Sequence, residues 1–146
     1  MTRFLLDTNI LSDFAKPVRS ASLIAWLGGQ LDDDLFTSAL SVAETWRGIL
    51  ILPRGKRRTE LERWFAGPDG PASLFAGRIL PFDARAALVW AELMAEGRAQ
   101  GKPRNALDMI VAAVAQANDC MVVTDNEKDF AGVEIFNPMR DGKAQR

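Results

Sequence analysis

The sequence predicts an α/β fold of three layers, in which a central, mainly parallel sheet of about five strands is covered by helices on both faces. Short apolar runs typical of buried strands alternate along the chain with longer segments of helical periodicity, an order typical of parallel sheets with right-handed crossovers. Glycine, proline and short polar residues mark most of the boundaries. With 146 residues, 48% of them hydrophobic, the chain is long enough for one compact domain with its own core.

The chain is expected to begin with a strand and two helices. The apolar run 3–6 stops at Asp7, and a short helix at 9–15 follows. This helix ends because a residue that precedes proline avoids helical geometry. Ser20 is the expected cap of a second helix, which the glycine pair at 28–29 ends.

A second strand at 35–38 leads into a helix at 41–50. The three aspartates before this strand, residues 32–34, fit a solvated turn better than a metal site. The segment 53–58 carries the densest positive charge of the chain and precedes a helix that ends at Gly67. This basic segment fits contact with phosphates and a solvated loop equally well.

Residues 67–77, rich in glycine, proline and alanine, are expected to form a loop. The strand candidate at 78–82 contains Pro81, which suits the edge of a sheet. Asp83 is the expected cap of a long helix. The expected core face of this helix consists of Leu88, Ala91, Met94 and Ala95.

The last third of the chain contains its most apolar helix and its clearest strand. The helix at 106–115 has few charges on any side, so we expect it to be buried. The strand at 121–124 is followed by a brief helical turn at 128–130 and a final strand at 133–136. The polar tail at 139–146 is expected to be frayed.

The composition excludes several kinds of catalytic site. The chain contains no His, no Tyr and one Cys. A Ser-His-Asp or Cys-His nucleophile, a ribonuclease mechanism with paired imidazoles and a Cys/His zinc site are therefore excluded. Any reaction must use carboxylates, hydroxyls, amides, Lys or Arg, with or without a hard metal ion.

The overall charge limits the partners that we expect. The net charge of −1 and the isoelectric point near 5.5 argue against general binding to polyanions, so contact with nucleic acid must come from local basic clusters. No apolar run approaches membrane-spanning length, and the N-terminal strand does not have the pattern of a signal peptide. We expect a cytoplasmic protein without membrane contact.

Several oxygen-bearing side chains are expected at one rim of the sheet, where strands end and helices begin. They are Asp7, Glu44, Asp108 and the turn from Thr124 to Asn126. Open α/β sheets bind ligands at the carboxyl ends of their strands. Carboxylates crowded there would repel and raise one another's pKa values unless a divalent cation neutralised them. Oxygen-only ligation selects Mg²⁺ or Mn²⁺.

Each acidic position also has a purely structural explanation. Asp7 fits the cap of the first helix, and Ser41 with Glu44 three residues later fits a capping box. Asp108, in the first turn of its helix, gains from the helix dipole, and Asn105 fits the cap. Against this explanation, an apolar helix leaves little water around Asp108, and an unpaired buried carboxylate is costly.

Four segments, in this order and spacing, carry a resemblance to a known family. They are Leu-Asp-Thr-Asn at 6–9, Ser-Val-Ala-Glu-Thr-Trp-Arg-Gly at 41–48, Asp108 at the start of an Ala-rich helix, and Val-Val-Thr-Asp-Asn-Glu-Lys-Asp-Phe at 122–130. The chain resembles a PIN-domain ribonuclease, the toxin of a VapBC-type toxin–antitoxin pair. The resemblance spans Arg3 to about Pro138, so we expect one PIN-like domain at 1–138 and a polar C-terminal tail at 139–146.

The resemblance implies a Mg²⁺- or Mn²⁺-dependent endoribonuclease that cuts structured RNA such as tRNA or rRNA. It also implies a homodimer or higher assembly and inhibition by a small cognate antitoxin. The family's three acidic positions match Asp7, Glu44 and Asp108. The fourth position, Asp or Asn in the family, falls on Asn126, while Asp125 stands where a basic residue is common. The expected fourth ligand is either the amide oxygen of Asn126 or the carboxylate of Asp125.

In the mechanism that the resemblance implies, a metal ion held by Asp7 and Asp108 activates a water for in-line attack on a phosphodiester. Glu44 holds a second metal ion or positions the water, and Thr124 orients a carboxylate or a metal-bound water. The expected substrate-binding residues are Asn9, Arg47, Arg54, Lys56, Arg57, Arg58 and Arg104.

Two other functions fit part of this pattern. A catalytically silent PIN-like module that binds RNA or a protein is favoured if the irregular fourth position prevents metal binding. A metal-dependent phosphatase of the haloacid dehalogenase type also begins with a strand that ends in Asp. That family places a second Asp two residues later, where this chain has Asn9.

Overall fold

The computed structural model describes residues 2–140 of the chain. Five strands form one sheet, and every pairing between neighbouring strands is parallel. In spatial order the strands are β3 (Ile79–Leu80), β2 (Leu35–Ser38), β1 (Arg3–Leu6), β4 (Cys120–Val123) and β5 (Ile135–Phe136). The predicted α/β architecture with about five strands is confirmed.

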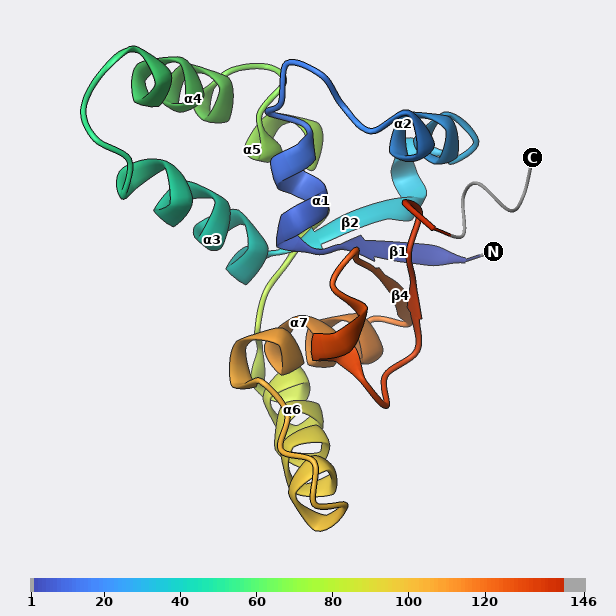
Figure 1. Ribbon diagram of the computed structural model, residues 1–146. Helices are drawn as coiled ribbons and strands as arrows, with labels where there is room; N and C mark the ends of the chain where they lie inside the picture. The colour runs from blue at the N-terminus through green and yellow to red at the C-terminus, as the bar shows by residue number, and fades with distance from the viewer. Residues whose placement is uncertain (1, 141–146) are drawn as a thin grey trace.

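Helices cover both faces of the sheet, as Figure 1 shows. The helices are α1 (Thr8–Asp13), α2 (Ala21–Gly28), α3 (Ala39–Leu50), α4 (Lys56–Ala66), α5 (Pro71–Leu74), α6 (Ala84–Ala99) and α7 (Ala106–Ala117), with 3₁₀ turns η1 (Asp32–Asp34) and η2 (Glu127–Phe130). In Figure 1, α6 and α7 lie below the sheet, α1, α2 and α5 lie above it, and α3 and α4 lie beside α1. None of the helices within residues 2–140 is long and apolar enough to cross a membrane.

The differences from the expected elements lie mainly at the edges of the sheet. The segments 78–82 and 133–136 form strands of only two residues each, β3 and β5, which lie at the two edges of the sheet. The expected loop at 67–77 contains α5, a single helical turn. Pro71 occupies its first position, where proline's missing N–H costs nothing.

The first strand occupies the point at which the direction of the chain through the sheet reverses. The chain passes from β1 to β2 and β3 on one side, and then returns to β4 and β5 on the other. Leu6, the last residue of β1, pairs with Thr37 of β2 and Val123 of β4. Open α/β sheets bind ligands outside the carboxyl ends of strands at such a switch point. The residue that follows Leu6 at this point is Asp7.

Two hydrophobic cores lie on opposite faces of the sheet, because successive side chains of a strand alternate between its faces. Leu5 and Val122 belong to the core that α6 and α7 cover. Leu6 and Val123 belong to the core that contains Ile10 and other residues of α1 and α2. The sheet and its two helical coverings are the three predicted layers.

The expected core face of α6 was wrong for three of its four residues, because only Met94 packs against the core. Leu88 is 70% exposed, whereas Ala86, Leu93 and Gly97 are buried. These three residues, spaced seven and four apart, lie on the side that packs against α7, where the Trp90 indole N–H donates to the Ala106 carbonyl.

The chain after β5 returns to the body of the protein. Asn137 and Pro138 are buried, and Met139 packs against the α1–α2 core. Arg140 forms an ion pair with Glu127. The expected frayed tail therefore begins with two anchored residues, and its remainder, 141–146, lies outside the described residues.

Candidate active site

Asp7 is held from two sides at the end of β1. Its Oδ1 accepts from the Thr8 backbone N–H at 2.8 Å, as expected of a helix cap, and its Oδ2 accepts from the Thr124 hydroxyl at 2.8 Å. The residue is only 4% exposed. Burial raises the pKa of the Asp7 carboxyl, the two hydrogen bonds lower it, and the charge of Glu44 raises it further. Asp7 is thus both a cap and a buried carboxylate close to a second one.

Thr124 connects the ends of β1 and β4. Its side chain is fully buried, and its hydroxyl accepts from the Asn9 amide at 3.1 Å and from the Asn126 backbone N–H at 3.0 Å. The single hydroxyl proton is therefore directed to Asp7. Asn9 also accepts from the Asp125 backbone N–H at 3.3 Å. Asn9, expected to bind substrate, instead joins the two turns on either side of Asp7.

Glu44 is turned toward Asp7 by a hydrogen bond across the rim. The Thr8 hydroxyl donates to Glu44 Oε1 at 2.8 Å. The alternative role in a capping box does not hold, because Ser38 caps α3 and its hydroxyl oxygen accepts from the Ser41 backbone N–H at 3.0 Å. Glu44 therefore lies more than one turn inside α3, and its carboxylate is not occupied by the helix terminus.

Asp108 completes the acidic group from the first turn of α7. Asn105 caps that helix and accepts from the Leu107 and Asp108 backbone N–H groups, both at 3.0 Å, so the Asp108 carboxylate is not needed as a cap. Burial raises the pKa of Asp108 to about 6, with further contributions from the charges of Asp7, Asp129 and Glu44. The carboxylates that follow β1 and that lie on α3, α7 and η2 are therefore close enough at this rim for their charges to interact.

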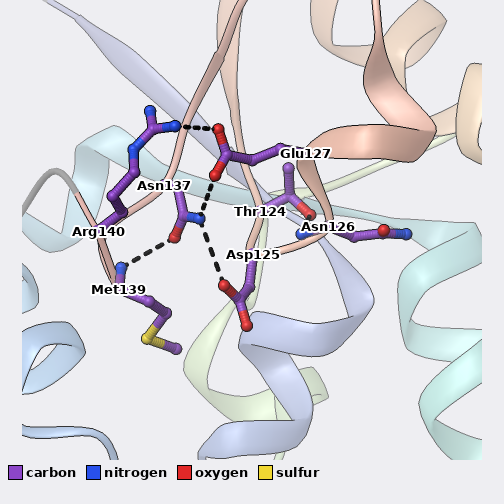
Figure 2. A network of polar contacts seen from close by, with 7 residues as sticks. All are labelled: Thr124, Asp125, Asn126, Glu127, Asn137, Met139 and Arg140. Atoms are coloured by element: carbon purple, nitrogen blue, oxygen red, sulfur yellow. Dashed lines mark hydrogen bonds and ion pairs between the residues drawn. The ribbon is translucent and has the colours of Figure 1, made fainter.

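In the turn after β4, the two candidates for the fourth metal ligand, Asp125 and Asn126, point in different directions (Figure 2). Asp125 is exposed, and its Oδ1 accepts from the Asn137 amide at 3.3 Å. Figure 2 shows Asn137 between Asp125 and Glu127, with Asn126 directed away from this cluster. The Asn126 amide donates to Asp129 Oδ2 at 2.7 Å.

Asp129 was missed by sequence reasoning. The sequence indicated a helical turn at this position but not the direction of its side chain. Asn126 is the cap of η2, and in a 3₁₀ turn residues three apart lie on the same side, which brings Asp129 next to Asn126. The spacing of three residues in the turn was the available signal.

The oxygen chemistry of these side chains suits a hard divalent ion. The donors at the rim are carboxylate, amide and hydroxyl oxygens, and among residues 2–140 no Lys or Arg forms an ion pair with Asp7, Glu44, Asp108 or Asp129. As they stand, no three acidic or Cys side chains of the described residues are grouped tightly enough to hold a metal ion. The carboxylates are thus close enough to raise one another's pKa values without being gathered to ligand distance.

Comparison with known proteins identifies the family. The model of the PIN domain family matches residues 4–135, which is most of the chain. The chain belongs to the PIN domain family. This PIN domain is 39% identical over 136 residues to VapC ribonuclease Y4jK of Sinorhizobium fredii, covering 92% of this chain and 96% of that protein. It is 36% identical over 139 residues to toxin FitB of Neisseria gonorrhoeae, covering 94% and 99%.

A solved structure agrees with this assignment. The crystal structure of FitAcB from Neisseria gonorrhoeae matches this PIN domain with a TM-score of 0.85 and 34% identity, over 94% of this chain and 99% of that one.

The predicted basic residues of the PIN domain fall into two groups. Arg47, Arg54, Lys56 and Arg57 are exposed, on α3, α4 and the loop between them. Arg57 and Glu44 line the same cavity of about 280 Å³ between α1, α3 and α4, so positive charge reaches one side of the acidic rim. Arg58 is instead paired with Glu62 at 2.7 Å along α4.

Arg104 has a packing role in the structure. Its side chain is 6% exposed, its Nη1 donates to the Leu93 carbonyl at 2.8 Å, and its Nη2 lies 3.7 Å from Glu96 Oε1. These contacts hold the segment before α7 against α6. The guanidinium that was expected to bind substrate thus makes its contacts within the protein.

Proposed function

We propose that this PIN-domain protein is a divalent-metal-dependent endoribonuclease and a toxin that a cognate antitoxin inhibits. The observation that carries the proposal is the convergence of Asp7, Glu44 and Asp108 at the switch point of a parallel sheet, where no Lys or Arg of the described residues forms an ion pair with them. The names ribonuclease and toxin, which two relatives more than 35% identical carry, support the same function.

In this proposal Asp7, Glu44, Asp108 and Asp129 hold Mg²⁺ or Mn²⁺ together with the amide oxygen of Asn126. When bound, the ion supplies Lewis-acid activation of a water and neutralises charge that develops on the phosphate. Asp129 provides a negative charge that Asn126 lacks. The Asp125 carboxylate, bound by Asn137 and exposed, has no part in this set.

The other residues of the site act by fixing orientation. The Thr124 hydroxyl holds one oxygen of Asp7, and the Thr8 hydroxyl holds one oxygen of Glu44, so each carboxylate keeps its second oxygen at a defined position. Such preorganisation lowers the cost of reaching the transition state. Arg57 lines the same cavity as Glu44, and in this proposal it contacts the phosphates of an RNA strand. We also propose that the protein acts in the cytoplasm.

Replacing Asp7 with asparagine tests the nuclease directly. We expect loss of Mg²⁺-dependent cleavage of total RNA, because the variant keeps the cap but removes a charged ligand. Asp33→Asn, the same change at an exposed position of η1, is the matched control and should keep full activity. EDTA should stop the wild-type protein. Cleavage by Asp7→Asn at the wild-type rate would refute the assignment.

Inhibition by a protein partner is the second part of the proposal. FitB of Neisseria gonorrhoeae is named a toxin and occurs in a solved complex, FitAB, bound to a DNA fragment. In the present chain the cavity beside Glu44 is also lined by Trp64, whose indole N–H is buried without a hydrogen-bond partner among the described residues. We propose that the antitoxin covers this cavity and that the toxin forms a homodimer. Cleavage assays with the product of an adjacent gene, and light scattering of the purified toxin, test these two points.

A further inference from the structure

A second cavity lies on the other side of the acidic rim. It has a volume of about 330 Å³ and lies between the α6–α7 connection and the turn that contains η2. Lys102 and Asn105 line it from the first segment, and Lys128, Asp129 and Gly132 line it from the second. The charge of Asp129 also raises the pKa of Asp108, so this residue of the cavity wall lies close to the acidic group.

The wall of this cavity is preformed. Arg104, which lines it, is clamped between two glycines that have no room for a side chain. A Cβ at Gly97 would lie 2.9 Å from the Arg104 Cγ, and a Cβ at Gly132 would lie 2.5 Å from its Nη2. Gly132 also has a φ of +84°, which favours glycine. The cavity is therefore a fixed feature of the fold, and a ligand would meet little cost of ordering its wall.

The lining of the cavity carries Lys102 and Lys128 against the single carboxylate of Asp129, so its charges favour an anion. Lys102 and Lys128 are exposed, and neither forms an ion pair with any residue of the described chain. Lysine is depleted in the cores of protein interfaces, whereas unpaired lysines are typical of phosphate contacts. The cavity therefore fits a nucleic acid better than a protein segment.

We propose that this cavity binds one unpaired nucleotide of the RNA substrate, next to the phosphate that is cut, and that Lys102 and Lys128 contact the flanking phosphates. This inference rests on the proposed ribonuclease function. A volume near the lower limit of small-molecule sites, roughly 300 Å³, admits a single nucleotide but not a base pair. The substrate strand must then be single-stranded or carry a flipped-out base at this position.

Binding of a fluorescein-labelled, unstructured 12-nucleotide RNA, measured by anisotropy in the Asp7→Asn background, tests the proposal. Each phosphate contact contributes about 0.7 to the slope of log Kd against log salt for a single strand, which is about fivefold in affinity at 0.1 M salt. Lys102→Gln with Lys128→Gln should therefore weaken binding about 25-fold and lower the slope by about 1.4. Arg63→Gln with Arg85→Gln, the same loss of charge at exposed positions outside both cavities, is the control.

Two further measurements separate the possible failures. In the otherwise wild-type enzyme the lysine variant should raise KM and keep kcat and Mn²⁺ affinity, because the acidic side chains are untouched. The 12-mer annealed to its complement should bind more weakly and respond little to the lysine changes. Unchanged RNA affinity and slope, in a protein that still cuts RNA, would overturn the nucleotide cavity alone. If the lysine variant keeps its RNA affinity but is no longer inhibited by the antitoxin, the cavity binds the protein partner and not a nucleotide. A wild-type protein that neither binds nor cuts RNA would overturn both proposals.

Discussion

Replacing Asp108 with asparagine is expected to stabilise the metal-free protein at neutral pH while it abolishes catalysis. In the native state the pKa of Asp108 is raised to about 6, from an ordinary value of 3.8, by burial and by neighbouring carboxylates. The unfolded chain therefore loses this proton at a lower pH than the native protein does. Stability falls as the pH rises from about 4 to about 6 and stays lower above that range.

The size of the effect follows from the same shift. A pKa that rises from 3.8 to about 6 corresponds to about 3 kcal/mol between the two states. The Asp108 side chain is only partly buried, so solvent screening reduces the expected gain in unfolding free energy to about 1 kcal/mol. Asparagine has nearly the same shape and no charge, so it removes the penalty without leaving a cavity.

Urea denaturation in EDTA at several pH values measures this gain. The difference between Asp108→Asn and wild type should be near zero at pH 4 and about 1 kcal/mol at pH 7.5. Asp33→Asn controls for the loss of one negative charge. Mg²⁺ at about 100 times its Kd should stabilise the wild-type protein by about 2.7 kcal/mol and the variant far less. A variant that is less stable than wild type at pH 7.5 in EDTA would refute the electrostatic reasoning.

Two further substitutions, each with a control, test the hydrogen bonds that hold Asp7 and the packing of the cavity wall. Thr124→Val leaves Asp7 without its hydroxyl donor and two partly buried N–H groups without their acceptor, so we expect a loss of about 3 kcal/mol in urea denaturation together with reduced cleavage. Thr37→Val, which removes an equally buried hydroxyl with one partner, should cost about 1 kcal/mol and leave cleavage intact. Gly132→Ala should cost at least about 1 kcal/mol more in thermal unfolding than Gly101→Ala, because both positions have positive φ but only the first meets a guanidinium. Equal losses for the two glycines would contradict a fixed cavity wall.

The parts of the site that could be predicted were those that follow from strand direction. In a parallel sheet the carboxyl ends of all strands reach one rim, so Asp7 after β1 and the Thr124 turn after β4 had to lie on the same side. Asp108 could be inferred because an apolar helix does not carry a carboxylate without a reason. Glu44 was placed at the same rim by the start of its helix, although Ser41 offered a local alternative that the structure excludes.

The parts that could not be predicted depend on contacts between distant segments. Arg104 was expected to bind substrate together with the other basic residues named in the sequence analysis. Its burial depends on Gly97 and Gly132, and no pattern in the sequence connects these two glycines with it. Likewise, the buried face of α6 was decided by its packing on α7 and not by its own periodicity.

The fourth acidic position is best understood as a pair of residues. The Asn126 amide N–H donates to the Asp129 carboxylate, which fixes the direction of the amide oxygen. The same hydrogen bond brings a negative charge next to the neutral side chain of Asn126. In the proposed site Asp125 does not serve in this way, because its carboxylate accepts a hydrogen bond from Asn137 on the other side of the turn, as Figure 2 shows. Metal affinity should therefore depend on Asp129 and hardly on Asp125. We therefore expect the neutral residue at position 126 to weaken the proposed metal site only when Asp129 is removed with it.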